Sequence, residues 1–218
     1  MNLRGVQFNT YHTGTDWKLI LNRKELSPPE PKEVNISVDG RDGDLDLSEA
    51  LTGEIKYNNR EASFVFLATE GSYLDREELI TDITREIHGR TCKITLDDDK
   101  EHYLLGRCKI VSVPNTNAYA TIEIECNCEP YRYALNETVR TFELTDQTIE
   151  ILLSNRGRKT VIPEVEIEGN ITLAFDEYQI SVPSGPYKFP DLIVSTGDKL
   201  VTLSGSGKIT FRYREGVL

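Results

Sequence analysis

The sequence predicts a mainly β protein of two domains with one long helix. Many runs alternate apolar and polar residues with a period of two, as half-buried strands do. One segment has apolar residues at helical spacing instead. The alternation stops abruptly at Glu129-Pro130-Tyr131-Arg132-Tyr133. Because 218 residues suffice for two domains that each bury a core, we expect domains over residues 1–133 and 134–218.

The first domain contains the longer alternating runs. Its predicted strands are Trp17–Leu21, Glu33–Val38, Glu54–Tyr57, Ser63–Ala68, Thr91–Leu96, His102–Val113 and Ala118–Cys128. The acidic stretch Asp97-Asp98-Asp99-Lys100 lies between two of them and predicts an exposed hairpin tip. The prolines within Ser27–Lys32 cannot donate to a ladder, so this segment is expected at a loop or sheet edge.

A single helix is predicted from about Asp75 to His88. Leu79, Ile80, Ile83 and Ile87 form an apolar stripe, which we expect to cover a β-sheet or barrel. Asp75, followed by Glu78 three residues later, predicts the helix start, and Gly89 predicts its stop.

The second domain reads as many short strands. They are expected at Val139–Leu144, Thr148–Leu153, Glu164–Ile167, Ile171–Phe175, Gln179–Val182, Asp191–Val194, Lys199–Leu203 and Lys208–Tyr213. Turn signals separate them, among them Glu168-Gly169-Asn170 and Ser204-Gly205-Ser206-Gly207. Short strands at this spacing indicate an antiparallel sandwich or jelly roll. The glycines at 205 and 207 lack the context of a dinucleotide site and are read as a tight hairpin.

Composition excludes several classes of function. The chain has 25 basic and 36 acidic residues, a net charge of −11, which argues against a protein that binds phosphate backbones. No apolar run approaches the ~18 residues of a membrane span, so we expect no membrane insertion.

The four cysteines could suggest a zinc site, but their positions favour burial. Cys126 and Cys128 continue the apolar positions of Ala118–Cys128, and Cys92 and Cys108 are in phase with the isoleucines near them. No Cys-x-x-Cys knuckle is present. We expect buried free thiols and no metal.

No catalytic site is predicted. His12, His88 and His102 have no recognisable nucleophile motif nearby. Asp42, Asp44 and Asp46 resemble the start of a calcium loop, but Leu47 stands where that loop needs glycine and Gly53 where it needs glutamate. We therefore expect no enzyme activity and no cofactor, with a weak ion site in the acidic turn left open.

Several fragments, in order, are similar to one protein family. Gly40, Gly43 and Leu45 precede Tyr57-Asn58-Asn59-Arg60, which resembles a tyrosine-x-asparagine-arginine signature. Further similar fragments are Gly5 with Phe8, Tyr103-x-x-Gly106-Arg107, Cys128-Glu129-Pro130-Tyr131, Asn155-Arg156-Gly157 with Pro163 and Gly169, and the ending FRYREGVL. Together they resemble the distal tail proteins, which form ring-shaped hubs in long non-contractile phage tails.

The resemblance implies a fold and a function. It implies an N-terminal split β-barrel with one helix and a β-hairpin arm, and a C-terminal galectin-like β-sandwich. Six copies would form a ring at the distal end of the tail tube, and two such rings could stack. The ring would link the tube protein to tail-tip and receptor-binding proteins of a phage or prophage particle. The protein would be located in the virion tail after assembly in the bacterial host cytoplasm.

Three hypotheses follow for particular residues and functions. Asp97, Asp98 and Asp99 are candidates to face the ring lumen and repel DNA, which would pass through without specific binding. Tyr57, Asn59 and Arg60 are candidates for a structural motif, with Arg60 ordering the preceding acidic turn. The alternative function is a carbohydrate-binding sandwich that aids attachment to the host surface. It predicts clustered, exposed aromatic residues on one sheet face.

Overall fold

The computed structural model describes residues 5–50 and 52–218, and the chain divides into two compact units. The first unit ends at Arg132 and the second begins at Tyr133, inside the run where the sequence alternation stops. β10 (Arg132–Ala134) spans this division. Each unit has a hydrophobic core of its own.

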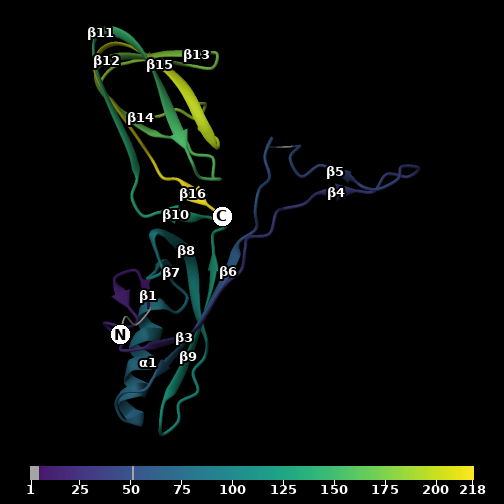
Figure 1. The fold of residues 1–218 in the computed structure, drawn as a ribbon, viewed down its shortest axis with the longest axis vertical. Helices are drawn as coiled ribbons and strands as arrows, with labels where there is room; N and C mark the ends of the chain where they lie inside the picture. The colour runs from purple at the N-terminus through teal and green to yellow at the C-terminus, as the bar shows by residue number, and fades with distance from the viewer. Residues whose placement is uncertain (1–4, 51) are drawn as a thin grey trace. The chain divides into compact units, whose positions relative to one another are not determined.

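The first unit is built on one antiparallel sheet with the order β2-β1-β7-β8-β9-β6-β3 (Figure 1). Its strands are β1 (Val6–Phe8), β2 (Tyr11–His12), β3 (Ile20–Leu26), β6 (Arg60–Ala68), β7 (Thr91–Leu96), β8 (Asp99–Ser112) and β9 (Ala120–Cys128). β2 and β3 stand at the ends of this path, so the sheet is open and not a closed barrel. The predicted strand Trp17–Leu21 is displaced: Trp17 is buried before the strand begins at Ile20.

The only helix of the described residues is α1 (Tyr73–Ile87), which packs its predicted apolar face on the sheet. Ile83 and Ile87 are fully buried in the core, with Leu79 and Ile80 packed against it. The helix begins earlier than predicted because its N-cap is Ser72, not Asp75. The Ser72 hydroxyl accepts a hydrogen bond from the Asp75 backbone N–H, and the Asp75 carboxylate accepts one from Ser72.

Arg76 ties the start of α1 to the loop before β9. Its guanidinium is buried and donates to the carbonyl oxygens of Gly71 and Thr116 at 2.7 Å, and to Asn115 Oδ1 at 3.1 Å. A buried arginine is tolerated because its donors are satisfied in this way.

An arm, described over residues 27–50 and 52–59, separates β3 from β6. Within it, β4 (Asn35–Ile36) and β5 (Leu45–Asp46) form a two-stranded sheet of their own, drawn in dark blue (Figure 1). Nearer the root, Tyr57 pairs with Pro31 in an isolated bridge. The predicted strands Glu33–Val38 and Glu54–Tyr57 are therefore wrong: they are longer than the observed pairing, because few residues here have a neighbouring strand to pair with.

The second unit contains three long antiparallel strands. β11 (Thr138–Asn155), β15 (Gly197–Tyr213) and β12 (Glu164–Phe175) are neighbours in that order. The two halves of β12 pair on their other side with β14 (Gly185–Lys188) and β13 (Tyr178–Val182). The predicted strand Asp191–Val194 is wrong: there is only an isolated bridge between Val194 and Val161.

The long strands bend at one common level. β11 has an irregularity at Asp146 (φ 50°), β12 contains Gly169 (φ 100°), and β15 contains Gly205 and Gly207 (φ 115° and 144°). Ser206 is the register partner of Thr145 on one side and of Asn170 on the other. The predicted hairpin at Ser204–Gly207 is thus wrong, because the strand continues through a bend that glycine permits.

This bend turns one sheet into two layers. Buried residues come from both halves of each long strand, such as Leu144 and Leu153 of β11 and Leu203 and Phe211 of β15. All of them belong to a single core cluster. The unit is the expected β-sandwich, made by folding a sheet on itself.

Candidate functional site: the arm and the charged face of the first sheet

Arg60 closes the root of the arm. It is the first residue of β6, and its side chain is buried. Its Nε donates to the carbonyl oxygen of Ser27 at 3.1 Å, while the Ser27 N–H donates to Glu61 O at 3.0 Å. Burial lowers the Arg60 pKa, and the Arg132 charge lowers it further. Arg60 therefore binds Ser27, at the other end of the arm, whereas we expected it to order the acidic turn.

The rest of the predicted motif also lies at this root. The Tyr57 ring packs edge-on against Tyr131, with ring centroids 6.2 Å apart. Asn59 Nδ2 donates to Asn127 Oδ1 of β9 at 2.6 Å. The structure brings Tyr57, Asn59 and Arg60 together as the place where the arm joins the sheet.

Further out, the arm exposes apolar side chains. Val34, Ile36 and Val38 are 51%, 46% and 43% exposed and alternate along an extended stretch, which places them on one side of the arm. Such a hairpin has almost no core, and a two-stranded hairpin alone is marginally stable in water.

The acidic turn at the tip of the arm does not gather ligands. Asp46 Oδ1 accepts a hydrogen bond from the Ser48 N–H at 2.9 Å, and the hydrogen bonds from Ser48 lower the Asp46 pKa. Across residues 5–50 and 52–218, no three His, Cys, Asp or Glu side chains are grouped so as to hold a metal ion.

Asp97, Asp98 and Asp99 all have side-chain partners. Asp97 accepts from the Gly5 N–H at 2.7 Å and lies 3.2 Å from His12 Nε2; Asp98 pairs with Lys24 Nζ at 2.5 Å. Asp99 lies 2.9 Å from both His102 Nδ1 and Arg132 Nη1. Burial of Asp99 acts to raise its pKa, but the hydrogen bond and charge of His102 and the charge of Arg132 outweigh it, so the pKa lies below its usual range. These carboxylates organise the β7–β8 turn locally.

The three histidines have structural partners. His12 Nδ1 accepts hydrogen bonds from the Gly14 and Thr15 N–H groups, and His88 Nδ1 accepts one from Ile110. Together with the His102–Asp99 pair, these contacts leave each histidine serving the local fold.

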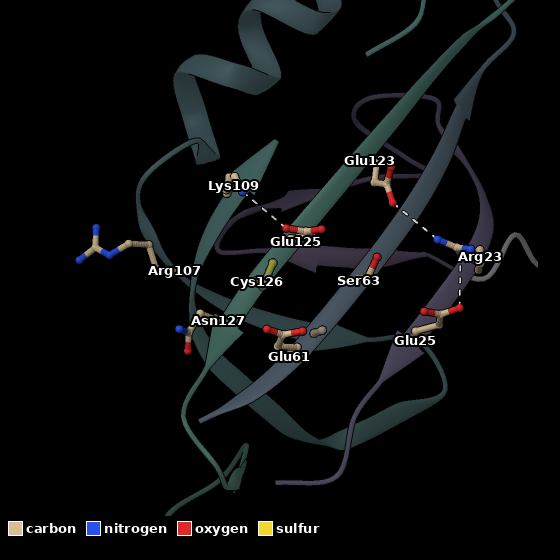
Figure 2. A pocket seen from close by; sticks show the side chains of 11 residues that line it. Arg23, Glu25, Glu61, Ser63, Arg107, Lys109, Glu123, Glu125, Cys126 and Asn127 are labelled. Carbon is tan, nitrogen blue, oxygen red and sulfur yellow. Dashed lines mark ion pairs between the residues drawn. The ribbon is translucent and has the colours of Figure 1, made fainter. Parts of the chain in front are cut away.

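A charged hollow lies on the face of the first sheet that is turned away from its core. It has a volume of about 480 Å³ and spans β3, β6, β9 and β8 (Figure 2). Figure 2 shows Ser63 along its middle, with charged side chains around it. The charged lining residues are Arg23, Glu25, Glu61, Arg107, Lys109, Glu123 and Glu125.

Ion pairs connect the strands across this charged face. Arg23 lies 3.5 Å from Glu123 and 3.6 Å from Glu25, and Lys109 lies 3.6 Å from Glu125. Arg107 donates instead to the carbonyl oxygen of Gly89 at 2.5 Å and points away from the hollow (Figure 2). The face carries three basic and four acidic side chains and is slightly acidic.

The second unit does not show the aromatic cluster that a sugar-binding face would need. Of its described aromatic residues, Tyr178 is the strongly exposed one. Tyr187 lies in a hollow with Glu166 and Arg212, but its ring is stacked on Phe189 and its hydroxyl donates to Pro183 O. These observations do not favour the carbohydrate-binding alternative.

Comparisons with known proteins were made by sequence and by structure. No protein-family profile and no curated protein matches the chain. Among solved structures, the crystal structure of phage SPP1 Dit aligns over 98% of this chain and 99% of that chain, with a TM-score of 0.70 and 12% sequence identity. SPP1 Dit is described as a paradigm of the hub adsorption apparatus in phages that infect Gram-positive bacteria.

The chain has the fold of SPP1 Dit. This confirms the predicted resemblance and the mainly β fold class with one helix. At 12% identity the likeness is one of fold, so the roles of particular residues depend on the contacts described above. The described part of the chain has no helix that is long and apolar enough to cross a membrane.

Proposed function

We propose that this protein is a structural component of a phage or prophage tail that forms a hexameric ring at the distal end of the tail tube. The observation that carries the proposal is the whole-chain likeness to SPP1 Dit, which extends over both units. The ring links the tube protein to tail-tip and receptor-binding proteins. It is assembled in the host cytoplasm and remains in the virion tail.

The arm supplies a contact between neighbouring subunits. Val34, Ile36 and Val38 gain little from burial within their own arm but bury apolar area against an adjacent copy. The ordered root at Arg60 and Ser27 fixes where the arm leaves the sheet. A head-to-tail contact that is repeated between copies forms a closed ring when the rotations from copy to copy add up to a full turn.

The channel repels DNA through acidic groups. Asp97, Asp98 and Asp99 remain candidates to line it, although each is paired with a cationic or histidine side chain. The charged face with Glu25, Glu61, Glu123 and Glu125 is a second candidate. Its sheet-wide layer of hydrated charges suits a water-filled passage better than a buried subunit contact, because charges that leave water need complete partners.

The mass of the assembly in solution tests the ring. Native mass spectrometry and light scattering of the full chain are expected to show a hexamer or a dodecamer of two stacked rings. A protein that stays monomeric at high concentration, alone and with the tube protein, contradicts the proposal.

A charge placed on the arm tests which surface closes the ring. Ile36→Asp is expected to convert hexamer to monomer while the circular dichroism spectrum and thermal unfolding stay unchanged, because Ile36 is exposed in a single copy. The matched control is Leu152→Asp, at a similarly exposed apolar position of the second unit. Loss of the hexamer in both variants, or in neither, would contradict the role of the arm in the subunit contact. It would not contradict the formation of a ring.

A further inference from the structure

Four buried thiols gather on the core face of three adjacent strands. Cys92 is on β7, Cys108 on β8, and Cys126 and Cys128 on β9. Cys108 and Cys126 are direct register partners, and their Sγ atoms are 3.1 Å apart. The two side chains therefore lie on one face and point at each other with no atom between them.

Register decides which of these thiols can be joined. Cα atoms of directly opposed antiparallel residues are about 4.5–5.5 Å apart, inside the usual range for a disulfide. Cys92 is opposite Gly106, so its Cα faces that of Cys108 only diagonally, at about 7–8 Å, although its thiol is hydrogen-bonded to the Cys108 thiol. Gly106 also stands between Cys92 and Cys128, because it pairs with both. Cys126 and Cys128 are two residues apart on one strand, which puts their Cα atoms about 7 Å apart. Cys108 with Cys126 is the one pair whose backbone already suits the bond.

We propose that Cys108 and Cys126 are a latent disulfide site, which closes when the protein meets a small-molecule disulfide such as oxidised glutathione. In the first step, the thiolate of one cysteine attacks a glutathione sulfur, and one reduced glutathione leaves. The second cysteine then attacks the protein sulfur of this mixed disulfide and releases the second glutathione. Two protein thiols are oxidised, the glutathione disulfide is reduced, and two protons are distributed to the released thiols and the buffer.

The buried position of the pair sets the conditions for this reaction. Both residues are almost fully buried, at 0% and 2% exposure. The hydrogen bond from Cys126 raises the pKa of Cys108, and with burial it outweighs the opposing hydrogen bond with Cys92, so in the closed fold the thiol stays protonated and unreactive. The link forms when β8 and β9 open transiently, and once formed it holds the two central strands of the first unit together against unfolding. This inference does not depend on the proposed ring.

The test is oxidation of the full-length protein under conditions that allow opening. The reduced protein is incubated with oxidised glutathione in urea just below its unfolding midpoint, returned to native buffer, alkylated and digested. We expect intact mass to show the loss of two hydrogen atoms, and peptide mapping to join Cys108 to Cys126. The urea midpoint should rise on oxidation and fall back with dithiothreitol.

Cysteine variants make the result specific. The double variant Cys92→Ala with Cys128→Ala should still form the link, and its urea midpoint should rise on oxidation. Cys108→Ala should form no link, and its midpoint should not rise. Cys126→Val serves as a second variant if Cys108→Ala does not fold. A link that joins another pair, glutathione adducts that never resolve, or a link that leaves the midpoint unchanged would overturn the proposal.

Discussion

Single side chains fix the places where this fold departs from regular sheet. Arg60 holds the root of the arm, Arg76 holds the loop before β9, and Asn155 holds the end of β11. The Asn155 side chain is buried, donates to the carbonyl oxygens of Lys159 and Val194, and accepts from the Gly157 N–H. In each case a polar side chain satisfies backbone groups that have no ladder partner, which a buried loop requires.

Arg60→Ala is expected to lower the free energy of unfolding by about 2 kcal/mol. The reason is that a part-buried, charge-assisted hydrogen bond to Ser27 O is lost. Chemical denaturation measures the change, with Arg23→Ala as the exposed control. Hydrogen exchange should also become faster in residues 27–35. Unchanged stability and exchange would show that Arg60 does not fasten the arm.

Asp99 is expected to make stability fall in acid. Its pKa is depressed in the folded state, so its contribution is complete above its unfolded pKa of about 3.9 and is lost as the pH falls through the lower folded pKa. Denaturation of the wild type and of Asp99→Asn from pH 6 to pH 2 measures this. The wild type should be more stable at pH 6 by roughly 1 kcal/mol, because solvent screens this partly exposed pair, and the difference should shrink in acid. A difference that is constant with pH would contradict this role.

At the scale of elements, the bend of the second unit depends on glycine. Gly169, Gly205 and Gly207 all have positive φ and lie where the strands cross closely. A Cβ at Gly169 would be 2.5 Å from the Ser206 carbonyl oxygen, and a Cβ at Gly207 would collide with that of Glu168. Glycine at these positions lets β12 and β15 bend next to each other, whereas β11 bends at Asp146.

Gly207→Ala is therefore expected to destabilise the protein by about 3 kcal/mol or more, combining backbone strain with a clash against main-chain atoms. Gly197→Ala is the matched control, since Gly197 also has positive φ but open space around it. It should lose about 1 kcal/mol from strain alone. Thermal unfolding compares the two. Equal losses would mean that the close approach of β12 and β15 is not what requires glycine.

These elements also show how far sequence reasoning reaches. The alternation of Ala118–Cys128 predicted a buried face, and Cys126 and Cys128 are buried on it. The same local reasoning failed at Gly205–Gly207, because glycines that end a strand and glycines that bend one look alike without the partner strands. It also failed in the arm, where residues 33–38 alternate as a strand should. Whether such a segment pairs depends on strands far away in the chain.

At the scale of the whole molecule, each of the two units has a hydrophobic core of its own. We expect fragments 1–132 and 133–218 each to unfold cooperatively, with the first forming the ring and the second remaining monomeric. Size-exclusion chromatography with light scattering and circular dichroism measure this. If 1–132 folds but does not assemble, the subunit contacts need the second unit; if it does not fold, the boundary predicted near Tyr133 is not a domain boundary.

The sequence by itself determined which faces are apolar, where the helix ends, and that the four cysteines are buried, because these properties follow from local periodicity. The order of its short motifs also indicated the family fold that the structural comparison confirms. Only the tertiary structure decided that β11, β12 and β15 are continuous bent strands, that Arg60 fastens the arm, and that Cys108 opposes Cys126. Those facts depend on register and on contacts between residues distant in the chain, which no local pattern encodes.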